Sequence, residues 1–364
     1  KKIAKFIATG YLITIKIALV MRIQVYLFTT VFFLSLLTSI RIFGVDRDYY
    51  NYEKFYEKIS IGGYSSRFEP GFELVANLFK ILAGLDSFTL FLFFIAFVSL
   101  YLKFSILSNI RHYSLLILIY IMLILTLHEM MQIRIALATG IMYWALYKSA
   151  HFNIGFLKRV VLIGAGVSMH YSVIILAPFI LFDQIFYKHS RVLIALFIAI
   201  IFPVFINLTI SIAADFLPMV RHYLMQIGEG INTDINLFSS RNIILSTILF
   251  IGLLNFKYIP KEKLLWLYVS IAGMGVWYAF LWLPVFANRF HEITIFAYLV
   301  WVPSLPKISR IISLSLLFVL AVYFLVRALF LCLLSRMVLR LLNILLRKNL
   351  CCFSQSGFRE DFLF

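Results

Sequence analysis

Four short stretches of the chain combine arginine, histidine and carboxylate side chains within mostly apolar surroundings. They are Arg41 with Asp46 and Asp48, His128-Glu129 with Gln132 and Arg134, His170 with Tyr171 and Ser172, and Asn288-Arg289 with His291 and Glu292. An ionisable group inside or at the edge of a membrane helix is costly, by about 2.5–3.5 kcal/mol at the helix centre, so each stretch requires an explanation. If the four meet on one side of a membrane, they form a polar site where water-dependent chemistry can take place.

Structural roles compete with chemical ones at each stretch. Arg41 can extend its guanidinium to lipid headgroups, and His170 can be a packing residue that is hydrogen-bonded to another helix. Arg289 and Glu292 have the i, i+3 spacing of an ion pair that caps a helix. Glu129 and Arg134 do not have i, i+4 spacing, so a local ion pair does not account for Arg134.

The longest polar stretch before residue 210 is 41–80, which holds six of the sixteen carboxylates. Within it, Glu69-Pro70-Gly71 predicts a turn into a helix, because proline suits the first helical turn and apolar residues follow at helical spacing. The tyrosines of this stretch, among them Tyr49 and Tyr52, fit either an interfacial aromatic belt or platforms on which sugars stack.

The composition identifies an integral membrane protein. Of the 364 residues, 63% are hydrophobic and 13% are charged, whereas globular proteins have about 45–50% and about 25%. The net charge of +17 is concentrated in short loops, as topology signals are, and no continuous basic face with interleaved aromatics indicates nucleic-acid binding. The three cysteines, Cys332, Cys351 and Cys352, lack the spacing of a metal or redox site.

Apolar runs of about 15–20 residues recur along the chain and are long enough to cross a bilayer as helices. They predict an all-α polytopic fold of about 10–12 transmembrane helices in one domain, 1–330, with polar extracytoplasmic loops at about 41–85 and 210–241. Residues 331–364 are a basic tail that is either interfacial or outside the folded unit. The expected spans are a weak one at 1–20, then 23–40, 86–103, 113–127, 132–147, the pair 159–169 and 172–182, 192–209, 242–256, 264–283, 290–304 and 311–330.

Loop charges predict the side of the membrane that each loop faces. One set of loops carries many of the lysines, including Lys103 and Lys257, and only two acids, so the positive-inside rule places this set in the cytoplasm. The opposite set then takes all four polar stretches. This alternation requires that 159–182 form a hairpin with His170 at its tip, because a single crossing would invert every later loop.

Several ordered motifs resemble the EpsG-like family of Wzy-type polysaccharide polymerases. They are Arg41-x-x-Gly44 leading to Asp48-Tyr49-x-Asn51-Tyr52, then Glu69-Pro70-Gly71-Phe72, then Gln132-Ile133-Arg134-x-Ala136-Leu137-Ala138, and then His170-Tyr171-Ser172 before Pro178. The resemblance covers about residues 23–182 and afterwards weakens to Asn288-Arg289, which looks like the late outer-face arginine of the family. The Asp-Arg-Asp run at 46–48 and the cysteine-containing tail do not match the family.

The resemblance implies a glycosyltransferase that joins oligosaccharide repeat units at the outer face of the bacterial inner membrane, as in O-antigen or exopolysaccharide synthesis. Donor and acceptor are then both carried on undecaprenyl diphosphate, and the growing chain moves onto the new unit as a polyprenyl diphosphate is released. Because guanidinium groups bind phosphate oxygens bidentately, the expected diphosphate cradle is Arg41, Arg134 and Arg289. The base for the attacking hydroxyl is expected among His170, Asp48 and Glu69, with His170 favoured.

The remaining expectations concern the glycan and the partners. Glycan contacts are expected from Tyr49, Tyr52, Gln132 and Tyr171. No metal or other cofactor is expected, since arginines can supply the positive charge that the diphosphate needs. The expected partners are the two lipid-linked oligosaccharides, membrane lipid and a protein that regulates chain length, with no nucleic acid.

Other function classes stay open. A single-sugar transferase that uses a polyprenyl-phosphate sugar carries acidic residues in its first outer loop, which Asp46, Asp48 and Glu53 match, and often needs a divalent cation. A flippase or transporter would have ionisable groups at mid-membrane and internal repeats, whereas the sequence has no repeat and its charges are expected toward one rim. A receptor or a purely structural membrane protein is a further alternative.

Overall fold

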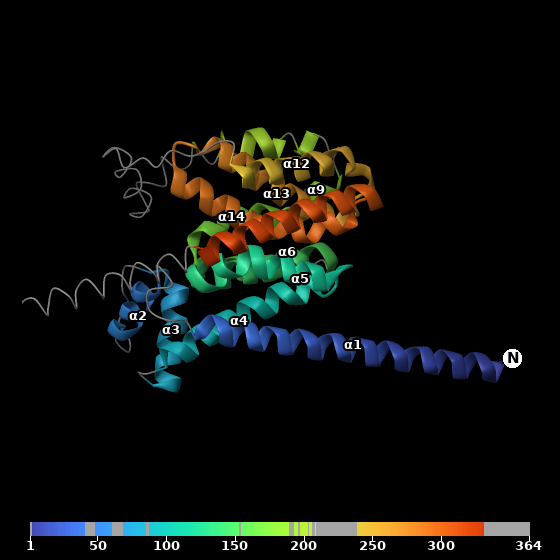
Figure 1. Cartoon of the computed structure of the whole chain (residues 1–364), viewed down its shortest axis with the longest axis horizontal. Helices are drawn as coiled ribbons and strands as arrows, with labels where there is room; N and C mark the ends of the chain where they lie inside the picture. The colour runs from blue at the N-terminus through green and yellow to red at the C-terminus, as the bar shows by residue number, and fades with distance from the viewer. Residues whose placement is uncertain are drawn as a thin grey trace, which may run out of the picture.

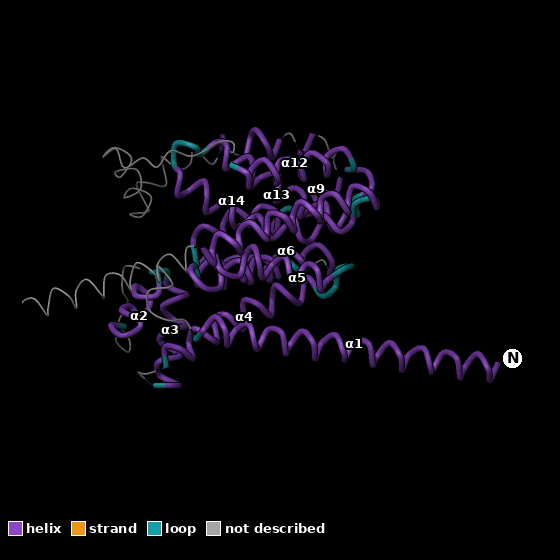
Figure 2. The backbone as a smooth tube through the Cα atoms, in the orientation of Figure 1, coloured by secondary structure: helices purple, strands orange, loops and turns teal. Residues whose placement is uncertain are grey.

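The computed structural model describes residues 2–40, 48–59, 68–84, 87–152, 154–188, 193–195, 197–202, 204–205, 208 and 239–330. These residues form helices joined by turns, without any strand among them, and this confirms the predicted all-α fold (Figure 2). Arg41, Asp46, residues 210–238 of the second predicted loop and the tail 331–364 lie outside the described residues.

The helices follow one another along the whole described chain. They are α1 (Lys2–Ser39), α2 (Tyr49–Lys58), α3 (Pro70–Ala83), α4 (Phe88–Leu107), α5 (Tyr113–Tyr120), the π-helix η1 (Ile121–Met131), α6 (Ile133–Phe152), α7 (Phe156–Met169), the 3₁₀-helix η2 (Tyr171–Leu176), α8 (Ala177–Leu181), α9 (Asp183–Lys188), α12 (Ser240–Leu254), the 3₁₀-helix η3 (Phe256–Tyr258), α13 (Lys261–Ala279), α14 (Pro284–Trp301), the 3₁₀-helix η4 (Val302–Ser304) and a last helix, Lys307–Phe330.

Four helices within the described residues are long and apolar enough to cross a membrane. They are Met21–Ser39 of α1, Phe88–Leu107, the continuous run of α5 and η1 from Tyr113 to Met131, and Lys307–Phe330. Most of the other predicted spans correspond to helices that are shorter or less apolar, among which α6 packs against Phe88–Leu107. The protein is therefore a polytopic, membrane-embedded helical protein.

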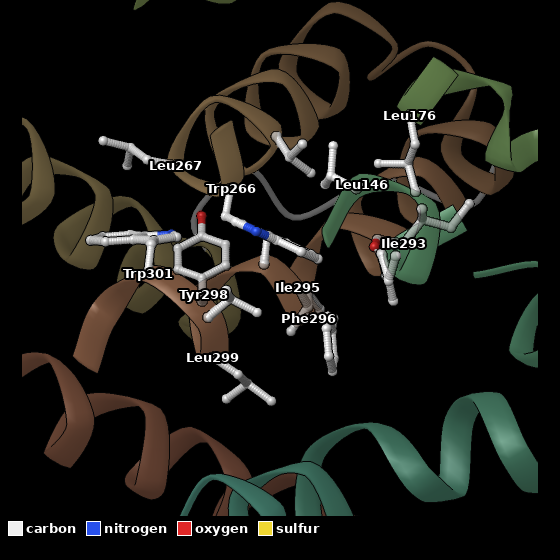
Figure 3. Packing of buried hydrophobic residues seen from close by; sticks show 14 of the residues in the cluster. Leu146, Leu176, Trp266, Leu267, Ile293, Ile295, Phe296, Tyr298, Leu299 and Trp301 are labelled. Atoms are coloured by element: carbon white, nitrogen blue, oxygen red, sulfur yellow. The ribbon is translucent and has the colours of Figure 1, made fainter. Parts of the chain in front are cut away.

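The helices form a bundle with a small lobe at one end (Figure 1). Helix α1 runs along α4 and reaches far beyond the bundle, and α2 and α3 form the lobe near the first residues of α4. In the second half of the chain, α13 and α14 pack against each other over much of their length. Their contact buries Trp266, Tyr298 and Trp301 (Figure 3), and the Trp301 indole N–H donates to Ser270 Oγ at 3.0 Å.

A lysine fastens the two lobe helices together. Lys80 of α3 is buried, and its Nζ donates to the backbone carbonyls of Tyr56, Glu57 and Ile59 at 2.9, 3.0 and 2.8 Å. The last carbonyls of a helix have no partner within the helix, so a cation there satisfies them and complements the helix dipole. All three ammonium donors are used, and α2 is thereby fixed on α3.

The predicted hairpin around His170 is confirmed. Arg159 in the first turn of α7 forms an ion pair with Asp183, the first residue of α9, and its Nη1 donates to the Ile180 carbonyl at 2.9 Å. Helix α7 also packs directly on η2 and α8. The chain therefore runs through α7, reverses direction at His170 and returns alongside α7 through η2 and α8.

The prediction that Lys103 lies in a cytoplasmic loop is wrong. Helix α4 continues to Leu107, and Lys103 lies inside it with a fully buried side chain. Its Nζ is 2.7 Å from Oε1 of Glu129, which is also fully buried. A lysine can lie inside a membrane bundle when a carboxylate neutralises it, so charge counting misplaced this residue. The expectation that the charges gather toward one rim does not hold for this pair.

Candidate active site

The centre of the candidate site is a single carboxylate, Glu69, whose side chain is 1% exposed. One carboxylate oxygen, Oε1, is hydrogen-bonded to Nδ1 of His170, and the other, Oε2, accepts a hydrogen bond from Nη1 of Arg134. These partners are 101 and 65 positions away along the chain. The site thus unites the polar lobe, the start of α6 and the tip of the hairpin.

The sequence Glu69-Pro70-Gly71 explains how the carboxylate reaches this position. Glu69 has extended backbone (φ −70°, ψ 142°) just before α3, and Pro70 starts the helix with the φ angle that a first turn needs. Gly71 lets α3 approach α7 closely, because a Cβ atom at this position would lie 2.8 Å from the backbone oxygen of Ser168. Ser168 precedes His170 by two residues, so this close approach brings Glu69 to the histidine.

His170 lies at the break between α7 and η2. Its backbone is extended (φ −164°, ψ 123°), which ends α7 at Met169 and turns the imidazole toward the lobe. The residue is 3% exposed, and its second ring nitrogen, Nε2, has no hydrogen-bond partner among the described residues. A carboxylate on Nδ1 orients an imidazole and selects its tautomer, which leaves Nε2 as the nitrogen that can exchange a proton.

Arg134 is the second residue of α6 and covers an aromatic wall. Its guanidinium carbon lies 4.6 Å from the ring centre of Phe68 and 5.9 Å from that of Tyr52. The side chain is 16% exposed, and its Nε has no partner among the described residues. Stacking on the rings and pairing with Glu69 hold the guanidinium plane in one orientation while leaving donors for a ligand.

The electrostatics of Glu69 follow from these contacts. Burial alone would raise the pKa of this carboxyl group, but the hydrogen bond from His170 and the positive charge of Arg134 outweigh burial and lower the pKa from 4.5 to about 2. Glu69 lies outside the membrane-spanning helices and is ionised throughout the physiological pH range. It is therefore poorly suited to accept a proton and well suited to position the two groups that it holds.

The second half of the chain contributes a neighbouring polar cluster. Arg241, the second residue of α12, donates from Nη2 to Oδ1 of Asn288 at 2.7 Å, and its Nη1 lies 3.6 Å from Glu292. Glu292 also interacts with Gln132 and with the charge of Arg289. The charges of Arg289 and Arg134 both act on His170. Arg289 of α14 is thus near the Glu69 site, as the sequence predicts.

The other predicted site residues have different positions. Asp48 is the residue before α2, and Arg41 lies outside the described residues. Tyr49 packs on Phe88, whereas Tyr52 is buried in the aromatic wall below Arg134. Tyr171 is 42% exposed beside His170, so of the predicted glycan contacts it offers the most open aromatic face.

Sequence reasoning missed Arg241 and left the role of Glu292 open. Arg241 stands at the end of the second polar loop, where no local pattern distinguishes it from other loop cations. An i, i+3 ion pair with Arg289 was one of two readings of Glu292, and the structure adds Arg241 on α12, whose Nη1 lies 3.6 Å from the Glu292 carboxylate. Only the packing of α12 near α14 selects this partner.

Four residues at or near the cluster have a buried polar atom that makes no hydrogen bond among the described residues. The atoms are Gln132 Oε1, Arg134 Nε, His170 Nε2 and Ser172 Oγ. Each buried polar atom without a partner costs about 1–3 kcal/mol, so these four atoms are available to bind a polar ligand or water beside Glu69. The arrangement can hold an anion beside Arg134 and accept a proton at His170.

The comparisons with known proteins identify a family. The family model described as the EpsG family matches residues 24–338, which is most of the chain and includes all four polar stretches. No curated protein and no solved structure matches the chain.

Proposed function

Since the chain belongs to the EpsG family, we propose that it is a membrane-embedded polysaccharide polymerase that transfers a glycan from one polyprenyl diphosphate to the repeat unit on another. Family membership connects the chain with polysaccharide synthesis in general. The transfer of whole repeat units, the undecaprenyl carrier and the outer face of the bacterial inner membrane are the proposal. The observation that carries it is the carboxylate of Glu69, which holds a histidine base and an arginine side by side.

The proposed reaction has a balanced set of bond changes. A hydroxyl oxygen of the acceptor sugar attacks the anomeric carbon of the donor glycan, and the bond from that carbon to the diphosphate oxygen breaks. The hydroxyl proton goes to Nε2 of His170, and the bonding electron pair leaves with the diphosphate. Charge therefore develops on the leaving group, where a fixed guanidinium stabilises it best.

Each residue of the cluster has one role in this scheme. His170 is the base, because its Nε2 is the buried nitrogen without a partner. Arg134 binds the leaving diphosphate with donors that Glu69 does not use, and Arg289 adds positive charge from α14. Glu69 is a positioning residue that holds both groups and fixes the imidazole tautomer. This assignment favours His170 over Glu69 as the base.

The test is a reaction of the purified protein with an oligosaccharide on a polyprenyl diphosphate. The proposal expects a ladder of products whose steps are whole repeat units. A product longer by one sugar when a polyprenyl-phosphate sugar is supplied, or a loss of activity with chelator, would favour the single-sugar transferase and contradict the proposal.

The matched variants are Arg134→Lys and Arg111→Lys. Arg111 is an exposed arginine in the turn after α4, so its replacement should leave the ladder unchanged. Lysine at position 134 keeps the charge but loses the bidentate geometry and the stacking on Phe68, and we expect about a tenfold or greater loss of polymer at unchanged protein level. Equal polymer in the two variants would remove Arg134 from the site.

A further inference from the structure

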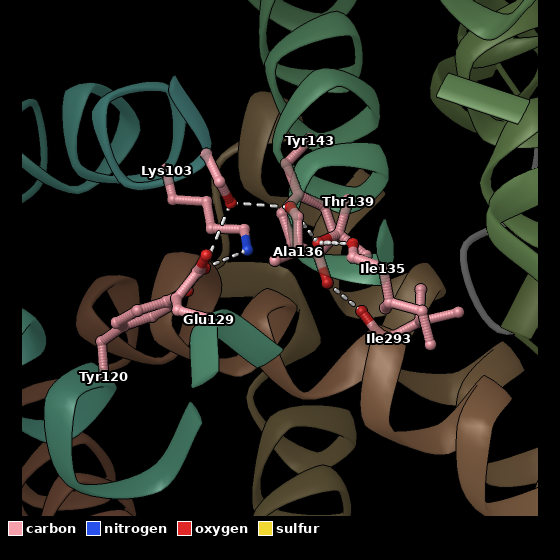
Figure 4. Close-up of polar contacts among 9 residues, drawn as sticks. Lys103, Tyr120, Glu129, Ile135, Ala136, Thr139, Tyr143 and Ile293 are labelled. Atoms are coloured by element: carbon pink, nitrogen blue, oxygen red, sulfur yellow. Dashed lines mark hydrogen bonds and ion pairs between the residues drawn. The ribbon is translucent and has the colours of Figure 1, made fainter. Parts of the chain in front are cut away.

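A second polar network lies inside the bundle (Figure 4). Its centre is Oε1 of Glu129 in η1, which accepts hydrogen bonds from Lys103 Nζ at 2.7 Å, Tyr120 OH at 2.6 Å and Ser99 Oγ at 3.1 Å. Lys103, Tyr120, Ser99 and Glu129 are all 0% exposed. None of these residues has a role in the proposed reaction.

Stability alone is a weak reason for such a pair. Removing two charges from water costs about as much as their attraction returns, and apolar side chains of similar size often serve a buried position as well or better. Inside a membrane bundle an ion pair is therefore expected to have a specific task. The task is suggested by the backbone that the pair holds.

That backbone is an unusual helix next to the site. Residues 121–131 form a π-helix of eleven residues, whereas π-helical segments are mostly single turns and occur frequently at functional sites. The π-helix ends at Met131, and the N–H of the following residue, Gln132, is shared between the carbonyls of Leu127 at 3.1 Å and His128 at 3.2 Å. Helix α6 starts at the next residue, and Arg134 follows at once.

The network binds both sides of this junction. Tyr120 is the residue before η1, and Glu129 is in its last turn, so their hydrogen bond spans the π-helix. Ser99 Oγ of α4 lies within hydrogen-bond distance of both Glu129 Oε1, at 3.1 Å, and the Ala136 carbonyl in the first turn of α6, at 2.7 Å, and its single O–H donates to one of them at a time. Lys103 attaches the same carboxylate to α4. The end of η1 and the beginning of α6 are thus held against one fixed helix.

Register at this junction determines where Arg134 points. A change of one residue in helical register rotates the following side chains by about 100° and moves them by about 1.5 Å. Arg134 must meet Glu69 and Gln132 must meet Glu292, and both contacts are made within one turn of the junction. A π-helix that relaxed to an α-helix would change that register.

We propose that Lys103 and Glu129 are a buried positioning pair that holds the η1–α6 junction in the register that places Arg134 and Gln132 in the active site. The pair touches no substrate. The inference relies on the proposed function only for its effect on catalysis, because the register itself is a property of the protein alone.

The experiment replaces both charges together, in the double variant Lys103→Met with Glu129→Leu. Because apolar replacement of a buried pair is often neutral or stabilising, the thermal midpoint should stay within about 4 °C of the unchanged protein. Hydrogen exchange at the amides of residues 130–137, measured in lipid nanodiscs, should rise about tenfold or more, and kcat/KM should fall about tenfold or more. Retained stability with lost activity separates positioning from a purely structural role.

Another buried ion pair, Arg159 with Asp183, gives a matched control. Arg159→Met with Asp183→Leu removes the pair at the opposite end of the hairpin and should leave exchange at 130–137 unchanged. Tyr120→Phe removes one hydrogen bond only and should raise that exchange by about two- to fivefold, which keeps the inference testable if the double variant does not fold.

Two results would overturn the inference. One is unchanged exchange at 130–137 in the double variant and in Tyr120→Phe; the other is increased exchange with an unchanged kcat/KM. If the unaltered protein makes no polymer at all, the proposed function fails, but the exchange measurements still decide whether the pair sets the register.

Discussion

Replacing Glu69 by glutamine tests the central contact of the site. Both partners, His170 Nδ1–H and Arg134 Nη1–H, donate hydrogen bonds, and a carboxylate can accept both. The glutamine amide has almost the same shape but offers one oxygen and one NH₂ group. In Glu69→Gln one donor therefore faces another donor, and the charge of Arg134 loses its partner.

The size of the effect follows from the pKa of Glu69. Its reduction from 4.5 to about 2 corresponds to about 3 kcal/mol of preferential stabilisation of the ionised carboxylate in the folded protein. Removing one member of a buried ion pair costs about 3–5 kcal/mol in other proteins, which is the same range. We expect Glu69→Gln to destabilise the folded protein at pH 7 by about 3 kcal/mol.

The sign of the pH dependence is fixed by the direction of the shift. A folded-state pKa below the ordinary value means that the unfolded chain binds more protons between pH 4.5 and about 2, so stability rises with pH in that window. The contribution of Glu69 is fully present above about pH 4.5 and is lost as the pH falls through 2. Between pH 7 and pH 3 it should shrink by about 2 kcal/mol.

The assay is thermal unfolding of the purified protein and of Glu69→Gln at pH 7 and at pH 3. The difference in unfolding free energy between the two proteins should fall by more than half at the lower pH. Glu57→Gln is the control, because Glu57 is an exposed carboxylate on α2, and it should change stability little at either pH. A difference between Glu69→Gln and the unaltered protein that is the same at both pH values would refute the assignment of Glu69 as an ionised, doubly paired carboxylate.

Two further predictions concern the groups around Glu69. Gly71→Ala places a methyl group 2.8 Å from the Ser168 backbone oxygen, and we expect it to lower the unfolding free energy by about 1–3 kcal/mol and to reduce polymer. The control Gly164→Ala meets nothing within 4 Å and should be neutral or slightly stabilising. Equal thermal midpoints for the two variants would contradict the close approach of α3 to α7. His170→Ala should abolish polymer at normal protein level, and His128→Ala or His151→Ala should damage synthesis far less; comparable losses in the three variants would indicate a packing role for His170.

Local pattern was enough to predict the class of the protein and several features of the site. Apolar runs of helical length determined a membrane-embedded, all-α chain, because the bilayer requires that each span satisfy its own backbone hydrogen bonds. Glu69-Pro70-Gly71 predicted the start of α3, and the charges on either side of 159–182 predicted the hairpin with His170 at its tip. These features depend on neighbouring residues and on membrane thickness, both of which a sequence contains.

Tertiary structure decided which residues meet. The sequence offered Glu69 as one of several bases, and its contacts with His170 and Arg134 support the positioning role that we propose for it. Tyr52 was expected to contact glycan or the membrane interface, and it is a buried part of the wall below Arg134. Lys103 was assigned to a loop, and Arg241 had no predicted role.

The sequence could not predict these contacts because they join residues that are far apart along the chain. Glu69 meets partners 65 and 101 positions away, and Lys103 meets Glu129 across two packed helices. A buried charge is tolerated only where packing provides a counter-charge, so its position depends on the mutual arrangement of helices rather than on its own neighbours in the sequence. The sequence by itself determined that this chain crosses a membrane as helices, and only the packing of those helices decided which arginine, histidine and carboxylate share one site.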